Sequence, residues 1–447
     1  MENSVFDQLL AKFKDPISKP SSSWWILLVA MLMIIAVGLF ALIQQIVHGH
    51  IVTGMRDHVV WGVFIVNFIF FLGIGYAGAI LAGIFHLTRL QWAKPLHRIA
   101  VWFSLIGLCV GPIFIFLCVG RLDRIHYLFT HARIQSPITW DVMAILTNLI
   151  LVSTYLYIAH IRDFAKLRDT DVFDLPKWKR KLYNKLALNY RGTHEQNHRL
   201  NRAQNGLAAT MIPAAIVADS LLAWLFGMSL RPGWHSTLFA PEFILVAIYS
   251  GVALLIVLMW FYRRKYQLDN LMTNQHFQYA GYLLLLLCLG FAYFTLSEYI
   301  TEWYNINETH ERWLDKFLTI GEFGIMSFAA IGFAIVIPLI ILIIPRFRNA
   351  GSITVVSGLI LIGLWLKRYL IIVPTLETPH LPIQDIRPEY VNYQATWVEW
   401  SLSLAGFALG VVLLLLLNYL APSIPVADIE RDDEIVVPKP FYKTSNE

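Results

Sequence analysis

The stretch "SPITWDVMAILTNLILV" (136–152) decides the fold class, because it places a carboxylate, Asp141, about one helical turn inside an apolar run. An ionised group in the hydrocarbon core of a membrane costs roughly 2.5–3.5 kcal/mol or more. Ser136 is a good N-cap and Pro137 suits a first helical turn, so a helix is predicted to begin just before the acid. Asp141 therefore needs a partner or a purpose inside a helix that otherwise suits lipid.

The whole chain shares this apolar character. Of its 447 residues, 57% are hydrophobic and 15% are charged, and the mean hydropathy is +0.58. A soluble protein of this size could not bury so much apolar surface, so the sequence predicts an all-α, polytopic integral membrane protein. The basic residues behind the net charge of +5 flank apolar runs, which is typical of topology signals and gives no indication of nucleic-acid binding.

Ten apolar runs are long enough to cross a bilayer core, which takes about 20 residues. They lie near 24–46, 59–86, 98–119, 138–161, 205–228, 239–262, 279–301, 318–345, 353–373 and 395–419. Both termini are predicted to be cytoplasmic, because that orientation places 25 of the 35 Lys and Arg residues on the cytoplasmic side.

The cysteines and histidines predict no metal centre in this chain. Cys109, Cys118 and Cys288 all fall in apolar runs, which excludes a disulfide framework, and no CxxCH or clustered cysteine set is present for haem attachment or iron–sulfur ligation. His86 and His160 lie near the inner ends of the second and fourth spans, but they lack a second axial pair, so haem b is not expected either.

Most ionisable residues of the spans fall near the non-cytoplasmic ends. The set comprises Arg121, Asp141, His235, Glu298, Glu322, Lys367 and Arg368. Such groups usually face a bundle interior or a water-filled cavity, so the set predicts a polar chamber beneath the outer surface. Simpler interpretations stay open for single members: Lys367 and Arg368 as interfacial anchors, Arg121 as a phosphate contact, and His235 as an ordinary loop histidine.

A second group of polar residues lies deeper. Asn148 and Tyr155 follow Asp141 at seven-residue intervals, on about the same helix face. Asp219 falls near the midplane of the fifth span, and Tyr76 falls in the inner half of the second. Because proton relays in membranes are built from such groups, Tyr76, Asp219, Asn148 and Tyr155 are the predicted proton path.

Five stretches together resemble the NrfD or polysulfide-reductase family of membrane subunits, most closely the ten-helix quinol-oxidising subunit of alternative complex III. They are "WGVFIVNFIFFLGIGYAGAI" (61–80), "VGRLDRIHYLF" (119–129), "SPITWDV" (136–142), "RPGWHSTLFAPEF" (231–243) and "KRYLIIVPT…ATWVEW" (367–400). The resemblance implies two four-helix bundles, spans two to five and six to nine, flanked by spans one and ten. The implied segments are a cytoplasmic N-terminal segment (1–23), the first span with its outer loop (24–58), the first bundle (59–228), the second bundle (229–373), an outer loop with the tenth span (374–420) and a cytoplasmic tail (421–447).

The resemblance also implies a quinone site in the first bundle, under the outer face. Asp141 falls on the family's acidic site residue and Arg121 on its Gly-Arg motif. With these two, the predicted quinone site contains His235, Trp140 and Cys118, and the predicted second-bundle polar cluster contains Glu298, Glu322, Lys367 and Arg368. Cys118, Tyr76 and Asp219 stand where the family pattern has histidines.

The implied function is that of a membrane subunit in a respiratory or photosynthetic electron-transfer complex of a bacterial inner membrane. It would bind menaquinone or ubiquinone near the periplasm and exchange electrons with an iron–sulfur partner subunit. Multihaem c-type cytochromes and a paralogous membrane subunit are further expected partners, and proton translocation is a further hypothesis. Two alternatives stay open: a quinone-inactive anchor or proton-path subunit, and a secondary transporter, which paired bundles and midplane acids also suit.

Overall fold

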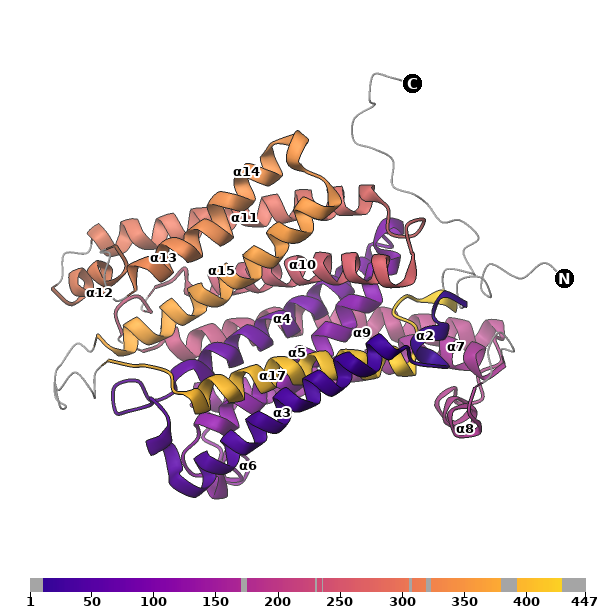
Figure 1. Cartoon of the computed structure of the whole chain (residues 1–447), viewed down its shortest axis with the longest axis horizontal. Helices are drawn as coiled ribbons and strands as arrows, with labels where there is room; N and C mark the ends of the chain where they lie inside the picture. The colour runs from indigo at the N-terminus through magenta and orange to yellow at the C-terminus, as the bar shows by residue number, and fades with distance from the viewer. Residues whose placement is uncertain are drawn as a thin grey trace.

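The structure is a computed structural model that describes residues 11–169, 175–229, 231–234, 236–304, 308–318, 323–378 and 392–427. Over these residues it is all-helical, and ten helical segments are long and apolar enough to cross a membrane. The long helices run roughly side by side along the longest axis of the molecule (Figure 1). The fold class and the ten predicted spans are confirmed.

Ten spans and several shorter helices follow one another along the described parts of the chain. The spans are α3 (Ser22–His48), α4 (Gly62–Leu87), α5 (Lys94–Cys118), α7 (Pro137–Asp169), α9 (His194–Gly227), α10 (Phe239–Tyr266), α11 (Asn274–Tyr304), the run of α13 (Gly324–Ile331), η4 (Gly332–Val336) and α14 (Ile337–Ile343), α15 (Ala350–Leu376) and α17 (Trp397–Leu420). The shorter helices are α2 (Lys14–Ile17), η1 (Gly49–Val52), η2 (Gln91–Ala93), η3 (Leu122–Arg124), α6 (Tyr127–Thr130), α8 (Lys177–Leu186), α12 (Glu308–Leu318) and η5 (Pro345–Phe347).

Two spans are longer than predicted. α7 continues to Asp169 and α9 already begins at His194, whereas the apolar runs stop at 161 and begin at 205. These extensions are polar, so hydropathy alone cannot detect them. α9 begins where the side chain of Thr193 accepts the amide N–H of Gln196 at 3.3 Å, a standard N-cap arrangement.

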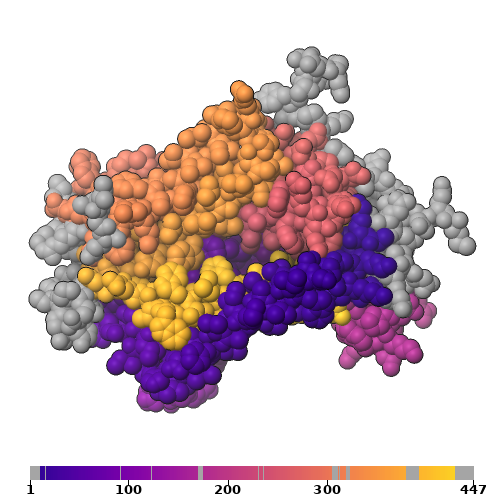
Figure 2. All heavy atoms as spheres, viewed as in Figure 1, coloured from indigo at the N-terminus to yellow at the C-terminus, as the bar shows by residue number. Residues whose placement is uncertain are grey.

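α4 is the central helix of the molecule. It packs against α5, α9, α10, α15 and α17, and nearly all of its side chains are buried. α3 instead pairs with α17, and the two lie side by side on the near face (Figure 2). The division into two separate bundles remains a prediction. α4 and α9 of the first predicted bundle pack directly on α10 of the second, so the two groups of helices are in close contact.

The two ends of the helix array differ in charge. We call the end that carries α2, α8 and the turn after α10 the basic end, and the end that carries α6 and α12 the α12 end (Figure 1). At the basic end, Lys179 donates to the carbonyl oxygens of Ile17 at 2.5 Å and Tyr419 at 2.6 Å. Tyr183 donates to the carbonyl of Leu420 at 3.0 Å. The bonds to Tyr419 and Leu420 satisfy carbonyls that the end of α17 leaves unpaired, and the bond to Ile17 does the same at the end of α2.

Burial of Lys179 should make the stability of the protein depend on pH. Burial lowers the pKa of its ammonium group from 10.5 to about 8. Between about pH 8 and 10.5 the folded chain therefore holds fewer protons here than the unfolded chain, so stability rises with pH across this window. We expect wild type to gain thermal stability relative to Lys179→Met over this window. A constant difference between the two melting temperatures would contradict this.

α4 and α5 approach closely where α5 carries a glycine. A Cβ on Gly107 would lie 2.5 Å from the carbonyl oxygen of Phe71 and 2.8 Å from the amide nitrogen of Gly75. Both are backbone atoms, so a side chain at this position forces the helices apart. The absence of a Cβ thus fixes the spacing of two central helices.

The variant Gly107→Ala tests this helix contact. We expect it to lower stability by about 1–3 kcal/mol, the usual cost of overpacking, in thermal unfolding of the detergent-solubilised chain. Gly206→Ala in α9 is the control, because nothing lies within 4 Å of the added Cβ. Gly206→Ala should raise the free energy of unfolding by up to about 1 kcal/mol, because alanine favours a helix more than glycine does. Equal responses of the two variants would show that the α4–α5 contact is not tight.

Candidate functional site

Four buried side chains from four helices form what we call the first polar cluster. They are Tyr76 of α4, Asp141 of α7, Asp219 of α9 and Arg368 of α15, each at most 4% exposed. Tyr76 lies within electrostatic range of both aspartates, Asp141 of Asp219, and Asp219 of Arg368. Residues nearly 300 positions apart in the sequence therefore meet at one place in the helix array.

Each member of the first polar cluster has a polar atom that makes no hydrogen bond within the described residues. These atoms are the Tyr76 hydroxyl, Asp141 Oδ1, Asp219 Oδ2 and Arg368 Nη1. Buried polar atoms are nearly always satisfied, because leaving one unpaired costs about 1–3 kcal/mol. Four such atoms gathered together indicate a site that accepts a polar group from a ligand or from water.

A glycine lets Arg368 reach this cluster. A Cβ on Gly73 would lie 2.7 Å from Nη2 of Arg368, so the guanidinium lies against the bare backbone of α4. The Arg368 Cζ also lies 5.4 Å from the centre of the Phe70 ring. The sequence pattern groups Arg368 with the second-bundle residues, but the structure directs it to the first polar cluster, because α15 packs on α4 as well as on α10.

The cluster continues toward the basic end along α7. Asn148 and Tyr155 are both buried, as the seven-residue spacing from Asp141 predicts for one helix face. Counting about 1.5 Å per residue, they lie about 10 Å and 21 Å beyond Asp141 along the helix. The Asn148 amide donates to the carbonyl oxygen of Ala214 on α9 at 3.2 Å, and its own Oδ1 has no partner among the described residues.

Two histidines outside the predicted proton path extend it further. The Tyr155 hydroxyl shares a hydrogen bond of 2.7 Å with Nε2 of His97 on α5. The His97 ring lies 5.8 Å from the ring of His86 on α4, which bonds Asn205 of α9 at 2.8 Å. His86 therefore faces His97, while His160 faces Trp102, from whose indole it accepts a hydrogen bond at 3.3 Å.

A second polar cluster lies among α10, α11 and α15. Lys367 donates a hydrogen bond to Glu298 and lies 3.8 Å from Oε1 of Glu242. Glu298 and Lys367 thus meet as predicted members of one cluster, whereas Glu242 was missed because it lies in the first turn of α10, where an acid also stabilises a helix end. Glu322 lies outside the described residues.

Three other predicted quinone-site residues, Arg121, Trp140 and Cys118, lie near the α12 end, outside the first polar cluster. Arg121 is 63% exposed and pairs with Asp123 at 2.9 Å rather than with Asp141. Trp140 is half-buried and donates its indole N–H to the carbonyl of Ile134. Cys118 is half-buried, and its thiol bonds the carbonyl of Ile115 in its own helix at 3.3 Å. His235 lies outside the described residues.

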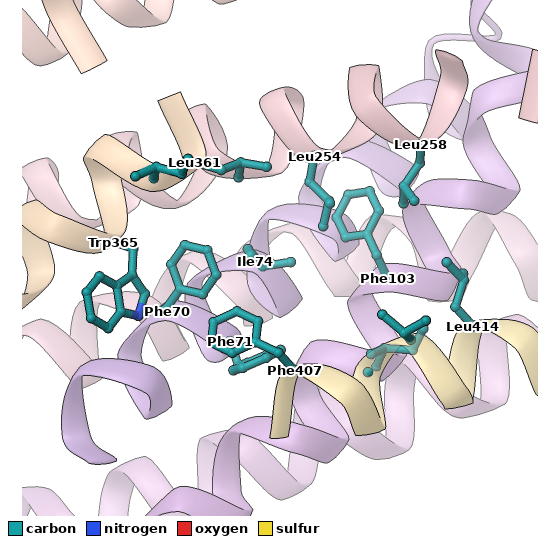
Figure 3. Close-up of a pocket in the computed structure, with 14 residues that line it drawn as sticks. Phe70, Phe71, Ile74, Phe103, Leu254, Leu258, Leu361, Trp365, Phe407 and Leu414 are labelled. Carbon is teal, nitrogen blue, oxygen red and sulfur yellow. The ribbon is translucent and has the colours of Figure 1, made fainter. Parts of the chain in front are cut away.

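An apolar cavity of about 420 Å³ adjoins the first polar cluster. Figure 3 shows side chains of α4, α5, α10, α15 and α17 pointing into it, among them Phe70, Phe71, Ile74, Phe103, Leu254, Leu258, Leu361, Trp365, Phe407 and Leu414. Phe70 lines this cavity and also contacts Arg368, so the cavity and the first polar cluster share a wall.

Over the described residues, fold and site together define a helical membrane protein with ten spans and with charged side chains buried between its helices. Within the described residues, no three His, Cys, Asp or Glu side chains are placed to hold a metal ion. The family model described as "Polysulphide reductase, NrfD" matches residues 51–380, and the chain belongs to this family.

Several relatives are named as subunits of reductases. A putative membrane subunit of dimethyl sulfoxide reductase from Halobacterium salinarum is 30% identical, over 52% of this chain and 50% of that protein. The chain thus matches about half the length of this relative. A selenate reductase subunit from Mesobacillus selenatarsenatis is 22% identical over 85% of this chain and 89% of that protein. The integral membrane subunit of menaquinone reductase from Nitratidesulfovibrio vulgaris is 23% identical over 87% and 89%.

Proposed function

We propose that this chain is the quinone-binding membrane subunit of an oxidoreductase complex, with the quinone ring held at the first polar cluster. The observation that carries the proposal is the set of four unsatisfied polar atoms on Tyr76, Asp141, Asp219 and Arg368 within the described parts of the chain. A relative named as a subunit of menaquinone reductase supports menaquinone as the ligand. The ten-span architecture also suits the likeness to the alternative complex III protein.

The residues of the cluster match the needs of quinone chemistry. A quinol gives up two electrons and two protons when it is oxidised, and the ring itself carries the redox step. Asp141 Oδ1 is placed to accept a proton from a ring hydroxyl, and Tyr76 and Arg368 are placed to donate hydrogen bonds to a ring oxygen. Two carboxylates and one guanidinium carry a net charge of −1, so one retained proton would neutralise the buried cluster.

A column of polar residues that starts in the first polar cluster supports a proton route to the basic end. Its predicted members are all buried: Asp219 and Tyr76 belong to the cluster, and Asn148 and Tyr155 follow along α7. His97 and His86 extend the column from Tyr155. We propose that protons released at Asp141 travel along this column, which would make the protein part of a proton-translocating device.

The charge asymmetry supports an orientation. The basic end would face the cytoplasm, with both termini, and the α12 end would face the periplasm of a bacterial cytoplasmic membrane. An iron–sulfur subunit would then dock over the α12 end and exchange electrons with the quinone. Arg121, exposed at this end, is a proposed contact for it, and His235 is a proposed hydrogen-bond partner of the second quinone oxygen. The proposed complex also includes multihaem cytochromes and a paralogous membrane protein.

Asp141→Asn in the assembled complex tests this function against its alternatives. A quinone-inactive anchor would show unchanged electron transfer, and a secondary transporter would lose substrate flux while electron transfer continued. The proposed quinone-binding protein would lose quinone turnover while it still assembled with its partners.

A further inference from the structure

The second polar cluster takes no part in the proposed quinone chemistry. Its three charged side chains, Lys367, Glu242 and Glu298, are between 5% and 12% exposed and come from three different helices. Lys367 donates a hydrogen bond to Oε2 of Glu298. It lies 3.8 Å from Oε1 of Glu242, an atom that has no hydrogen-bond partner among the described residues.

Among the residues that the structure describes, the charges of this cluster do not balance. One ammonium and two carboxylates carry a net charge of −1 when all three are ionised. Tyr299 lies beside the cluster: the centre of its ring is 5.8 Å from the Lys367 ammonium, and its hydroxyl is 3.4 Å from the hydroxyl of Ser327. Arg368, the next residue on α15, is directed to the first polar cluster. An unpaired negative charge in this environment costs several kcal/mol, and one bound proton removes that cost.

The geometry assigns the proton to one carboxyl. Glu298 takes the hydrogen bond from Lys367, which stabilises its ionised form. Glu242 lies farther from the ammonium group, and its Oε1 accepts no hydrogen bond from the described residues. We infer that the second polar cluster is a proton-binding site, in which Glu242 holds one exchangeable proton at neutral pH. This inference goes beyond the quinone proposal and does not depend on it.

Consecutive residues of α15 connect this proton site with the first polar cluster. Lys367 belongs to the second cluster and Arg368 to the first, where it lies within electrostatic range of Asp219. Each cluster thus contains one cationic side chain, Arg368 or Lys367, and two carboxyl groups. Because Lys367 and Arg368 are adjacent on α15, a proton bound at either cluster changes the electrostatic field at the other cluster.

Infrared spectroscopy of the detergent-solubilised full chain tests the inference, because protonated carboxyl groups have a C=O band that carboxylates lack. At pH 7 we expect Glu242→Gln to lose the equivalent of one protonated carboxyl relative to wild type. Glu298→Gln should lose the same intensity, because Glu242 then ionises beside Lys367. Lys367→Met should gain one protonated carboxyl. In D₂O the band that these variants remove should shift, as an exchangeable proton requires.

Glu399→Gln is the matched control. Glu399 is fully buried, but both of its carboxyl oxygens accept hydrogen bonds, from the amides of Gly54 and Thr396 and from the Tyr393 hydroxyl, so its replacement should leave the band unchanged. An unchanged band in both Glu242→Gln and Glu298→Gln would overturn the inference. A band that does not shift in D₂O would overturn the exchangeable proton.

Discussion

Asp141→Asn should lower quinone turnover of the assembled complex by about 10²–10⁴-fold, the range in which a positioned general acid or base contributes. The asparagine amide keeps the size and a hydrogen-bonding oxygen but cannot accept the proton of a quinol hydroxyl. Asp141 is 4% exposed, and its Oδ1 has no partner within the described residues. The measurement is steady-state electron transfer between a quinol and the partner proteins in membranes.

The control for this experiment is Asp269→Asn. Asp269 is 67% exposed, lies in the turn after α10 at the basic end and pairs with Arg263, so this substitution should leave turnover unchanged. Assembly is checked in both variants by co-purification of the partner proteins. Wild-type turnover in a fully assembled Asp141→Asn complex would contradict the role of this carboxyl and favour the anchor.

Arg98→Met should cause the largest loss of stability. Arg98 of α5 forms an ion pair with Asp163 of α7, and both side chains are only 2% exposed. Arg98 also donates to the carbonyl of Ile424 at 2.8 Å, while Asp163 accepts the amide of Ala427 at 3.0 Å. The pair therefore holds the segment after α17 against two spans. Removing one partner of such a pair costs about 3–5 kcal/mol.

The double variant Arg98→Met/Asp163→Leu separates lost charge pairing from lost packing. Without either charge no uncompensated carboxylate stays buried, so the double variant should recover part of the loss in thermal unfolding. Limited proteolysis should also cut Arg98→Met more readily after Leu420 than wild type. A double variant less stable than Arg98→Met would show that the charges do not compensate each other.

The spans and one face of the fourth span could be predicted from the sequence, because both depend on local patterns. Hydropathy summed over about 20 residues identifies a span wherever it packs. The seven-residue spacing of Asp141, Asn148 and Tyr155 predicts a shared helix face, and all three side chains are buried. Helix ends were less accurate, since α7 and α9 continue as polar helices past their apolar runs.

The partners of each polar residue could not be predicted, because they depend on how the helices rotate against one another. Lys367 and Arg368 are adjacent in sequence and belong to different clusters. Glu242 joins Lys367 from another helix, and His97 joins Tyr155 in the same way. The glycine at position 73, against which Arg368 lies, is one local signal that could have indicated the close approach.

The most direct test of the quinone site is a cryo-EM map of the assembled complex with a bound menaquinone analogue. We expect the quinone ring between α4, α7, α9 and α15, with one ring oxygen within hydrogen-bond distance of the Asp141 carboxyl. A ring bound elsewhere, with Tyr76, Asp141, Asp219 and Arg368 closed on one another and out of its reach, would contradict the central claim.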